Sequence, residues 1–144
     1  MNENELRVHM ALQALERHDV DALLVDAHPE IVFVNPPYAI EPGTRHGLDG
    51  FKTGIQNLLD AFEELRFDSE RVIDLGDRII GLGMWTGRGT GSGYEFDPQP
   101  YAFMVTLDEE GRMTRYEWFA EHEEALRAAG LSDPDAPESE RMST

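Results

Sequence analysis

The second half of the chain holds four segments that read as β-strands, separated by short turns rich in Gly and Asp. These segments span residues 66–75, 78–90, 93–107 and 112–119. Because turns this short join neighbouring antiparallel strands, the pattern predicts a four-stranded meander. A sheet must bury at least one of its faces, so the rest of the chain has to provide a cover.

The first half of the chain supplies that cover as helices. Apolar residues recur at helical spacing over residues 3–17 and 48–62, and Asp19 is placed to cap a short second helix. The β-branched run at residues 31–34 predicts one further strand, buried on both faces, and residues 121–129 predict a final helix. Helices that precede a block of strands favour an α+β domain, with helices packed on one face of an antiparallel sheet.

Composition restricts the partners and the chemistry of the protein. The chain has 144 residues, with 12 basic and 29 acidic side chains, a net charge of −17 and no cysteine. This charge repels phosphate groups, so neither nucleic acid nor an anionic membrane is an expected partner. Without cysteine there is no disulfide, thiol nucleophile or thiolate metal site. The chain has no apolar run of the roughly 20 residues that a membrane helix needs. Its first residues do not show the pattern of a signal peptide, so we expect a cytoplasmic protein.

The sequence predicts one domain followed by a tail. Residues 1–131 carry all of the predicted helices and strands and form the expected domain. Residues 132–144 are polar, acidic and proline-containing, with almost nothing to bury. We expect them to form a flexible acidic tail.

Four stretches of the sequence together resemble one family. They are ALERHDVDALL, HPEIVFVNPPYAIEPGTRHGLDGF, IDLGDRIIGLGMWTGRGTGSG and EEGRMTRYEWFAEHEEALRAAGL. Their order over residues 5–131 resembles the SnoaL-like polyketide-cyclase branch of the nuclear transport factor 2-like superfamily, which includes ketosteroid isomerases, limonene epoxide hydrolases and non-catalytic binding domains. The resemblance implies a cone-shaped α+β barrel, in which a curved, antiparallel-rich sheet wraps around the N-terminal helices and leaves one deep pocket.

The resemblance allows the catalytic groups of ketosteroid isomerases to be placed on this chain. In VNPPYAIEP, Asn35 stands where those enzymes carry the aspartate that shuttles the proton, and an amide cannot take up a proton in this range. Their two oxyanion donors fall on Ala11 and Phe103. The isomerisation depends on a base and on strong hydrogen-bond donors, so we reject this activity.

Limonene epoxide hydrolases use an Arg–Asp pair two residues apart and a second Asp on the last strand, with a Tyr and an Asn. The matching positions are Gly83, Trp85, Trp118, Phe33 and Asn35. Only the asparagine is retained, and a water nucleophile needs a base to activate it. A slip of one residue in this correspondence would instead turn Arg115 or Glu117 inward.

Alternation along the strands predicts which side chains line the interior. Ligand pockets are mostly apolar, and Trp and Tyr suit a cavity wall because each joins an apolar body to a polar tip. With the geometry of the family, the expected ligand-binding residues are Phe33, Trp85, Phe103, Tyr116 and Trp118. An ordinary aromatic core is the alternative interpretation of the same pattern.

The strand at residues 78–89 has two different faces. Gly81, Gly83, Gly87 and Gly89 share one face with Trp85. Strand glycines bend a sheet, admit a close helix or clear room for a ligand, and bending is the commoner role.

The opposite face of that strand is apolar. It carries Ile80, Leu82 and Met84, which are candidate contacts of the homodimer that the resemblance implies. The same side chains could instead contact the protein's own helices.

Candidates for chemistry remain near the loop after the first strand, which in this family runs near the pocket mouth. The catalytic candidates are Asn35, Tyr38, Glu41 and His46. A His and a Glu five residues apart could share a proton or polarise a carbonyl, although polar residues at such short spacing in a loop are usually solvated. We expect Arg88 to be an ion-pair partner and expect neither a metal site nor a cofactor.

Two classes of function therefore stay open, and the sequence leaves undecided whether the protein is an enzyme. The first is a cyclase, isomerase or hydratase that lacks the usual carboxylates, in which an aromatic cage stabilises a developing cation. The second is a non-catalytic ligand-binding or dimerisation module. In both, the expected ligand is a small apolar or aromatic molecule.

Overall fold

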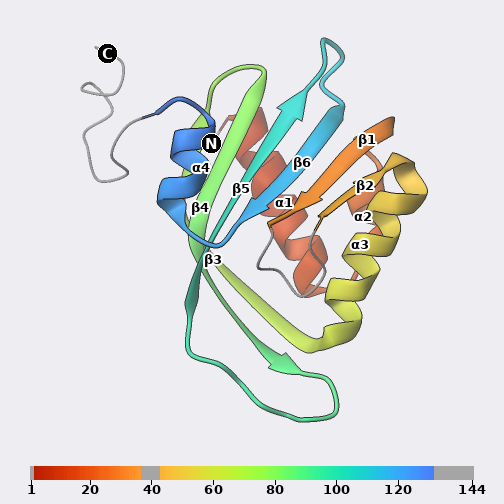
Figure 1. The fold of residues 1–144 in the computed structure, drawn as a ribbon, viewed down its shortest axis with the longest axis vertical. Helices are drawn as coiled ribbons and strands as arrows, with labels where there is room; N and C mark the ends of the chain where they lie inside the picture. Colours follow the sequence, from red (N-terminus) through yellow and green to blue (C-terminus); the bar gives the residue numbers. More distant parts are fainter. Residues whose placement is uncertain (1, 37–42, 132–144) are drawn as a thin grey trace.

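The computed structural model describes residues 2–36 and 43–131. Its elements are α1 (Glu3–Glu16), α2 (Val20–Leu24), β1 (Ala27–Asn35), β2 (Gly43–His46), α3 (Gly47–Ala61), β3 (Phe62–Asp74), β4 (Arg78–Gly89), β5 (Gln99–Leu107), β6 (Met113–Phe119) and α4 (His122–Ala128). The strands form one sheet in the order β2-β1-β6-β5-β4-β3, in which β1 and β6 run parallel and all other neighbours run antiparallel. Figure 1 shows this sheet curving around α1, so the predicted α+β class and curved, antiparallel-rich sheet are confirmed.

The N-terminal helices begin where their capping residues predict. The Asn2 side chain accepts a hydrogen bond from the Glu5 N–H at 2.8 Å, and the Asp19 side chain accepts one from the Ala22 N–H at 3.2 Å. Each bond satisfies an N–H group that has no partner inside its helix. The predicted cap at Asp19 is thereby confirmed.

The region between α2 and β3 differs from the prediction in three places. β1 is longer than the predicted residues 31–34, and its outward residues Val32 and Val34 are only half-buried, so burial on both faces is wrong. The strand β2 was not predicted, because this short and largely exposed edge strand has no apolar pattern. The third difference is Phe62, which belongs to β3 rather than to the helix before it.

The predicted meander is present as β3 to β6, with a bulge that bends it. Ser69 pairs with Gly83 but Arg71 pairs with Leu82, so Glu70 is an extra residue on β3. Such a bulge increases the local bend and twist of a strand. β5 starts at Gln99 instead of the predicted residue 93, because the preceding residues continue the turn after β4.

The sheet separates two hydrophobic cores. The larger one lies on the concave inner face, between the sheet and α1, α2 and α3, and includes Leu15, Ile31, Phe51, Ile55, Leu65 and Phe103. The smaller one lies on the outer face under α4 and consists of Ile73, Ile80, Leu82, Ala102, Met104, Ala125, Leu126 and Ala129. Helices therefore cover both faces of the sheet, and the prediction of helices on one face only is wrong (Figure 1).

The helix α4 occupies the surface that was considered for a dimer contact. Ile80 is 0% exposed and Leu82 is 3% exposed in the single chain, because α4 packs over both. The His122 imidazole Nε2 also lies 2.9 Å from the Gly83 carbonyl oxygen and links α4 to β4. Of the two interpretations of this apolar face, contact with the protein's own helix is the one observed, and the homodimer stays a prediction.

None of the helices in the described ranges is long and apolar enough to cross a membrane. The predicted tail, residues 132–144, lies outside the described residues.

Candidate functional site

Aromatic rings form one connected set across the inner face of the sheet. Its members are Phe33, Phe51, Phe62, Phe67, Trp85, Phe96, Tyr101, Phe103, Tyr116 and Trp118. Neighbouring ring centroids lie between 4.8 Å, for Trp85 and Phe96, and 6.4 Å, for Tyr101 and Trp118. Stacked and edge-to-face pairs at such distances are the arrangements that aromatic quadrupoles favour.

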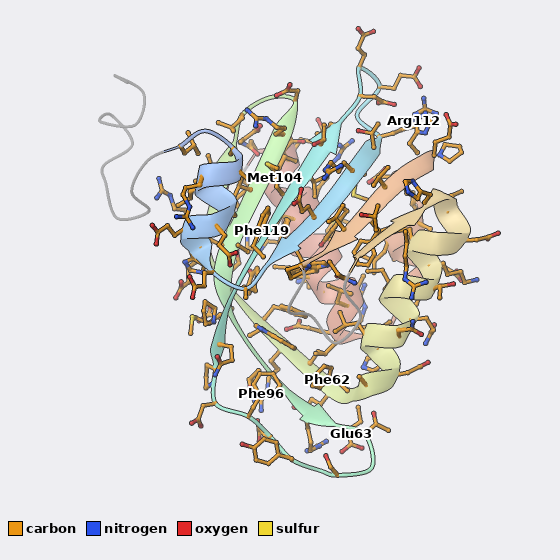
Figure 2. All side chains as sticks on the ribbon, viewed as in Figure 1. Phe62, Glu63, Phe96, Met104, Arg112 and Phe119 are labelled. Atoms are coloured by element: carbon orange, nitrogen blue, oxygen red, sulfur yellow. The ribbon has the colours of Figure 1, made fainter. Side chains whose placement is uncertain are left out.

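This ring set is closed at one end and accessible at the other. Phe51 and Phe103 lie in the core and are 0% and 2% exposed. At the opposite end, Phe62, Phe67, Trp85 and Phe96 are all half-buried, and we call these four the open-end rings. Figure 2 shows Phe62 and Phe96 at the lower end of the sheet, where β3 begins and β4 ends. We call this end of the molecule the open end of the cone.

The glycines of β4 make room for these rings. A Cβ atom on Gly81 would lie 2.3 Å from the Phe103 ring, and one on Gly83 would lie 2.6 Å from the Tyr101 ring. Gly83 also faces the bulge in β3, where its Cβ would lie 2.2 Å from the Asp68 carbonyl oxygen. At these two positions glycine permits the close approach of the protein's own aromatic rings, and the bending of β4 by its glycines stays a prediction.

The ionisable groups within the ring set are tyrosines held in the neutral state. Burial raises the pKa of Tyr101 to about 12, and the negative charges of Asp68, Glu70 and Glu16 act in the same direction. Burial raises the pKa of Tyr116 above its usual range as well. The Tyr101 hydroxyl is shielded from solvent and has no hydrogen-bond partner among the described residues. Neither tyrosine can act as a general base near pH 7.

The five predicted ligand-binding residues all lie on the inner face. Phe33, Phe103 and Tyr116 are buried there, while Trp85 and Trp118 are half-buried. The ring contacts among them confirm the predicted strand faces, although a contact with a ligand stays a prediction.

The alternative correspondence with the relatives, shifted by one residue, would turn Arg115 and Glu117 inward, and the structure contradicts it. Arg115 and Glu117 point to the outer face of β6, where the guanidinium Nε lies 3.2 Å from the carboxylate. Arg88 is also an ion-pair partner, as predicted, with its guanidinium 2.8 Å from Glu63 and 2.9 Å from Glu64.

Of the four catalytic candidates, the structure describes Asn35 and His46 and places them on different faces of the sheet. Asn35 ends β1, pairs with Gly43 of β2 and by alternation shares the face of Phe33, whose partner on β6 is Tyr116. His46 pairs with Val32 on the outer face and is exposed, away from the rings. Tyr38 and Glu41 lie outside the described residues.

Several members of the ring set were not identified from the sequence. Phe51 was predicted only as part of a helix face, and Phe62 was assigned to the same helix. Phe67 precedes the bulge and Phe96 belongs to an irregular turn, so strand alternation could not place either ring. Strand alternation did indicate one further member, Tyr101, because it lies two residues before Phe103 on β5 and shares its face.

Two hollows lie beside the open end, along β3 and β4, and the smaller one is lined by residues of both faces of the sheet. One, of about 380 Å³, is lined by Arg66, Thr86, Glu95, Phe96, Asp97 and Pro98. The other, of about 310 Å³, is lined by Glu16, Arg66, Phe67, Asp68, Met84, Trp85, Thr86 and Pro98. The deep interior pocket implied by the resemblance stays a prediction. No group of His, Asp and Glu side chains in the described part of the chain is arranged to hold a metal ion.

The fold and its inner face of aromatic rings define a class of protein. The SnoaL-like domain family model matches residues 8–116 of the chain. The protein therefore belongs to the SnoaL-like domain family. No curated protein matches the sequence.

Solved structures share this fold at low sequence identity. A nuclear transport factor 2-like protein of unknown function from Burkholderia pseudomallei K96243 is 24% identical, with a TM-score of 0.71 over 88% of this chain and 97% of that chain. TerC, co-crystallised with polyporic acid, is 20% identical, with a TM-score of 0.69 over 88% and 97%. A protein of ketosteroid isomerase-like fold from Catenulispora acidiphila DSM 44928, in complex with trimethylamine, is 17% identical, with a TM-score of 0.68 over 90% and 96%.

Proposed function

We propose that this protein binds a small apolar or aromatic molecule at the open end of its cone, against the open-end rings and Trp118. One observation carries the proposal: a connected set of rings, buried at one end, ends in half-buried rings at the other. Half-buried aromatic surface on the concave side of a sheet gains free energy when a further apolar ring covers it.

The chemistry of the inner face favours binding over acid–base catalysis. The positions at which relatives carry catalytic carboxylates hold Trp85, Phe103 and Trp118, and all three rings belong to the connected set. The two buried tyrosines are neutral near pH 7. The described interior therefore provides packing surface but no base among these groups.

Asn35 supplies the polar contact of the proposed site. Its amide both donates and accepts hydrogen bonds, and alternation from Phe33 turns it to the inner face, directly after the Val34–Glu117 pair of the ladder. A ligand that covers Trp118 could thus present a carbonyl or hydroxyl group to Asn35, which would set its orientation.

Two proteins of the same fold support a small-molecule role. TerC was co-crystallised with polyporic acid, and the Catenulispora acidiphila protein was solved with trimethylamine. From these two proteins we carry over to this chain one point only, which is that the fold accommodates a small ligand.

A second candidate is catalysis of a cyclisation, isomerisation or hydration. The position of Asn35 at the end of β1, on the face of Phe33, favours it, because an amide donor and an aromatic wall can stabilise opposite charges that develop during a reaction. Tyr38 and Glu41 remain catalytic candidates of this second proposal. We also keep two wider proposals from the sequence, a cytoplasmic location and a homodimer.

The proposed function is tested with the neutral fluorescent probe N-phenyl-1-naphthylamine, excited outside the tryptophan absorption band. We expect Trp85→Ala to weaken binding of the probe about tenfold or more, because removal of the indole deletes the centre of the open-end rings. We expect His46→Ala to leave binding unchanged, because that side chain is exposed on the outer face.

Trp85→Phe is the matched control, because it retains a ring and should recover part of the affinity. Circular dichroism establishes that each variant is folded. Equal losses in Trp85→Ala and His46→Ala, or a larger loss in His46→Ala, would contradict the proposed site.

A further inference from the structure

The two longest helices both end at the open-end rings. The Asn4 side chain of α1 donates to Asp74 at the far end of β3, whereas Glu16 accepts a hydrogen bond from the Phe67 N–H at 2.9 Å. α1 therefore runs toward the open end, and α3 ends at Ala61, directly before Phe62 (Figure 1). Neither helix has a basic residue in its last turn, although the exposed Arg17 follows α1 as its C-cap residue. Because the C-terminal end of a helix acts as about half a negative charge, two negative poles meet here.

Carboxylates add to the negative potential at this end. The Arg66 guanidinium lies 2.7 Å from Glu95 and 3.4 Å from Glu64, and Arg88 is held between Glu63 and Glu64. Three glutamates therefore neutralise two arginines, and one negative charge is left over. Figure 2 shows Glu63 at the same lower end of the sheet as Phe62 and Phe96.

The Glu16 carboxylate is a further acid of this region. It bonds only to a neutral N–H among the contacts observed and lines the smaller hollow together with Asp68. The inner face has a cation in Arg45, but this residue pairs with Phe33 and packs against Gly50 of α3, on the opposite side of the ring set from Trp85. Apart from the exposed Arg17 at the end of α1, an anion at the open-end rings would therefore meet carboxylates and already paired arginines.

The rings themselves prefer a cation. The face of an aromatic ring carries partial negative charge, and tryptophan attracts cations most strongly. Trp85 contacts Phe62, Phe67 and Phe96, and all four are half-buried. A partly desolvated cation next to this surface would be attracted by the rings, by two helix ends and by Glu16 together.

We propose that the open end of the cone selects a cationic ligand, in which an ammonium group is joined to an apolar or aromatic body. This inference rests on the proposed function and adds to it the charge of the ligand. The apolar body covers the open-end rings, and the ammonium group lies toward Glu16 and the C-terminal ends of α1 and α3. No reaction is needed for this selection.

The test compares three compounds with one body and three charges. They are 1-naphthylmethylamine, 1-naphthylmethanol and 1-naphthylacetate, each used to displace N-phenyl-1-naphthylamine at low ionic strength and neutral pH. We expect the amine to bind roughly tenfold more tightly than the alcohol, from the combined cation–π and helix-end attraction. The acetate should bind most weakly, and added salt should narrow the differences.

The variants separate a local effect from the attraction that any cation feels toward a chain of charge −17. Glu16→Gln keeps an oxygen for the Phe67 N–H and removes one charge, so affinity for the amine should fall about threefold while the alcohol is unaffected. Glu123→Gln on the outer helix α4 changes the net charge equally and should have no effect.

Each other outcome overturns a defined part of the account. If the amine and the alcohol bind equally, the cationic preference is wrong and the proposed function stands. An amine preference that Glu16→Gln and Glu123→Gln reduce equally would show attraction by net charge and overturn the inference. If the neutral probe itself does not bind, the proposed function fails, whatever the charged compounds do.

Discussion

The two faces of β4 and β5 are built from alternate residues of the same strands, yet they bury different kinds of side chain. On the inner face, Gly81 and Gly83 lie under the rings of Phe103 and Tyr101. On the outer face, Ile80 and Leu82 pack with Ala102, Met104 and the apolar side of α4. Figure 2 shows Met104 and Phe119 on this outer side, next to α4.

The two faces therefore have different roles: the outer face contributes to the stability of the fold, and the inner face contributes to stability and to the proposed ligand binding. The outer core is aliphatic and sealed by α4, with Ile80, Ala102, Ala125 and Leu126 fully buried. The inner core is aromatic and ends in half-buried rings, so part of its apolar surface remains available to a ligand. Changes on the outer face should therefore lower the free energy of unfolding alone, whereas changes on the inner face should also alter probe binding.

The largest expected effect is on the outer face. Leu126→Ala removes a fully buried side chain from the smaller core, and we expect the free energy of unfolding to fall by about 2–5 kcal/mol. Urea denaturation measures this change, with Leu6→Ala, at a 50% exposed position, as the control of small effect. At a urea concentration where the variant is folded, its affinity for N-phenyl-1-naphthylamine should equal that of the parent protein. A loss of affinity would contradict the separation of the two faces.

A smaller effect is expected on the inner face. Gly81→Ala places a methyl group 2.3 Å from the Phe103 ring, which contacts Trp118, so the ring must shift at a cost of about 1–3 kcal/mol. This shift should change the near-ultraviolet circular dichroism and weaken probe binding. Ala102→Val overfills the outer face of the neighbouring strand. It should destabilise the protein but leave the near-ultraviolet circular dichroism and the probe binding unaltered. Unaltered spectra and affinity in Gly81→Ala would show that the glycine is not needed by the rings.

Local patterns in the sequence were sufficient to predict most of the fold. Helical spacing located α1 and α3, Asp19 capped α2 as predicted, and the turns at Gly76 and Gly111 delimited the strands around them. These features depend on residues a few positions apart. β2 and the placement of α4 depend on pairing and packing between distant segments, and the local pattern does not contain that information.

The candidate site was predicted in part for the same reason. Alternation together with the family resemblance placed Phe33, Trp85, Phe103, Tyr116 and Trp118 on the inner face correctly, because each lies in a regular part of its strand. It could not place Phe67, which is followed by the bulge at Glu70, or Phe96, which lies in a turn. The position of His46 on the outer face follows from the register of β2, which the sequence did not reveal.

The central claim is that a small molecule binds at the open end of the inner face, and the two tryptophans test it directly. Trp85 and Trp118 are the only tryptophans of the chain, and both belong to the half-buried part of the ring set. We would titrate ¹⁵N-labelled protein with N-phenyl-1-naphthylamine and follow the two indole N–H resonances together with the backbone amides of α4. The account predicts that both indole resonances shift with one dissociation constant while the amides of His122–Ala128 stay in place. Static indole resonances with shifts confined to α4 would place the ligand on the outer face and contradict the account.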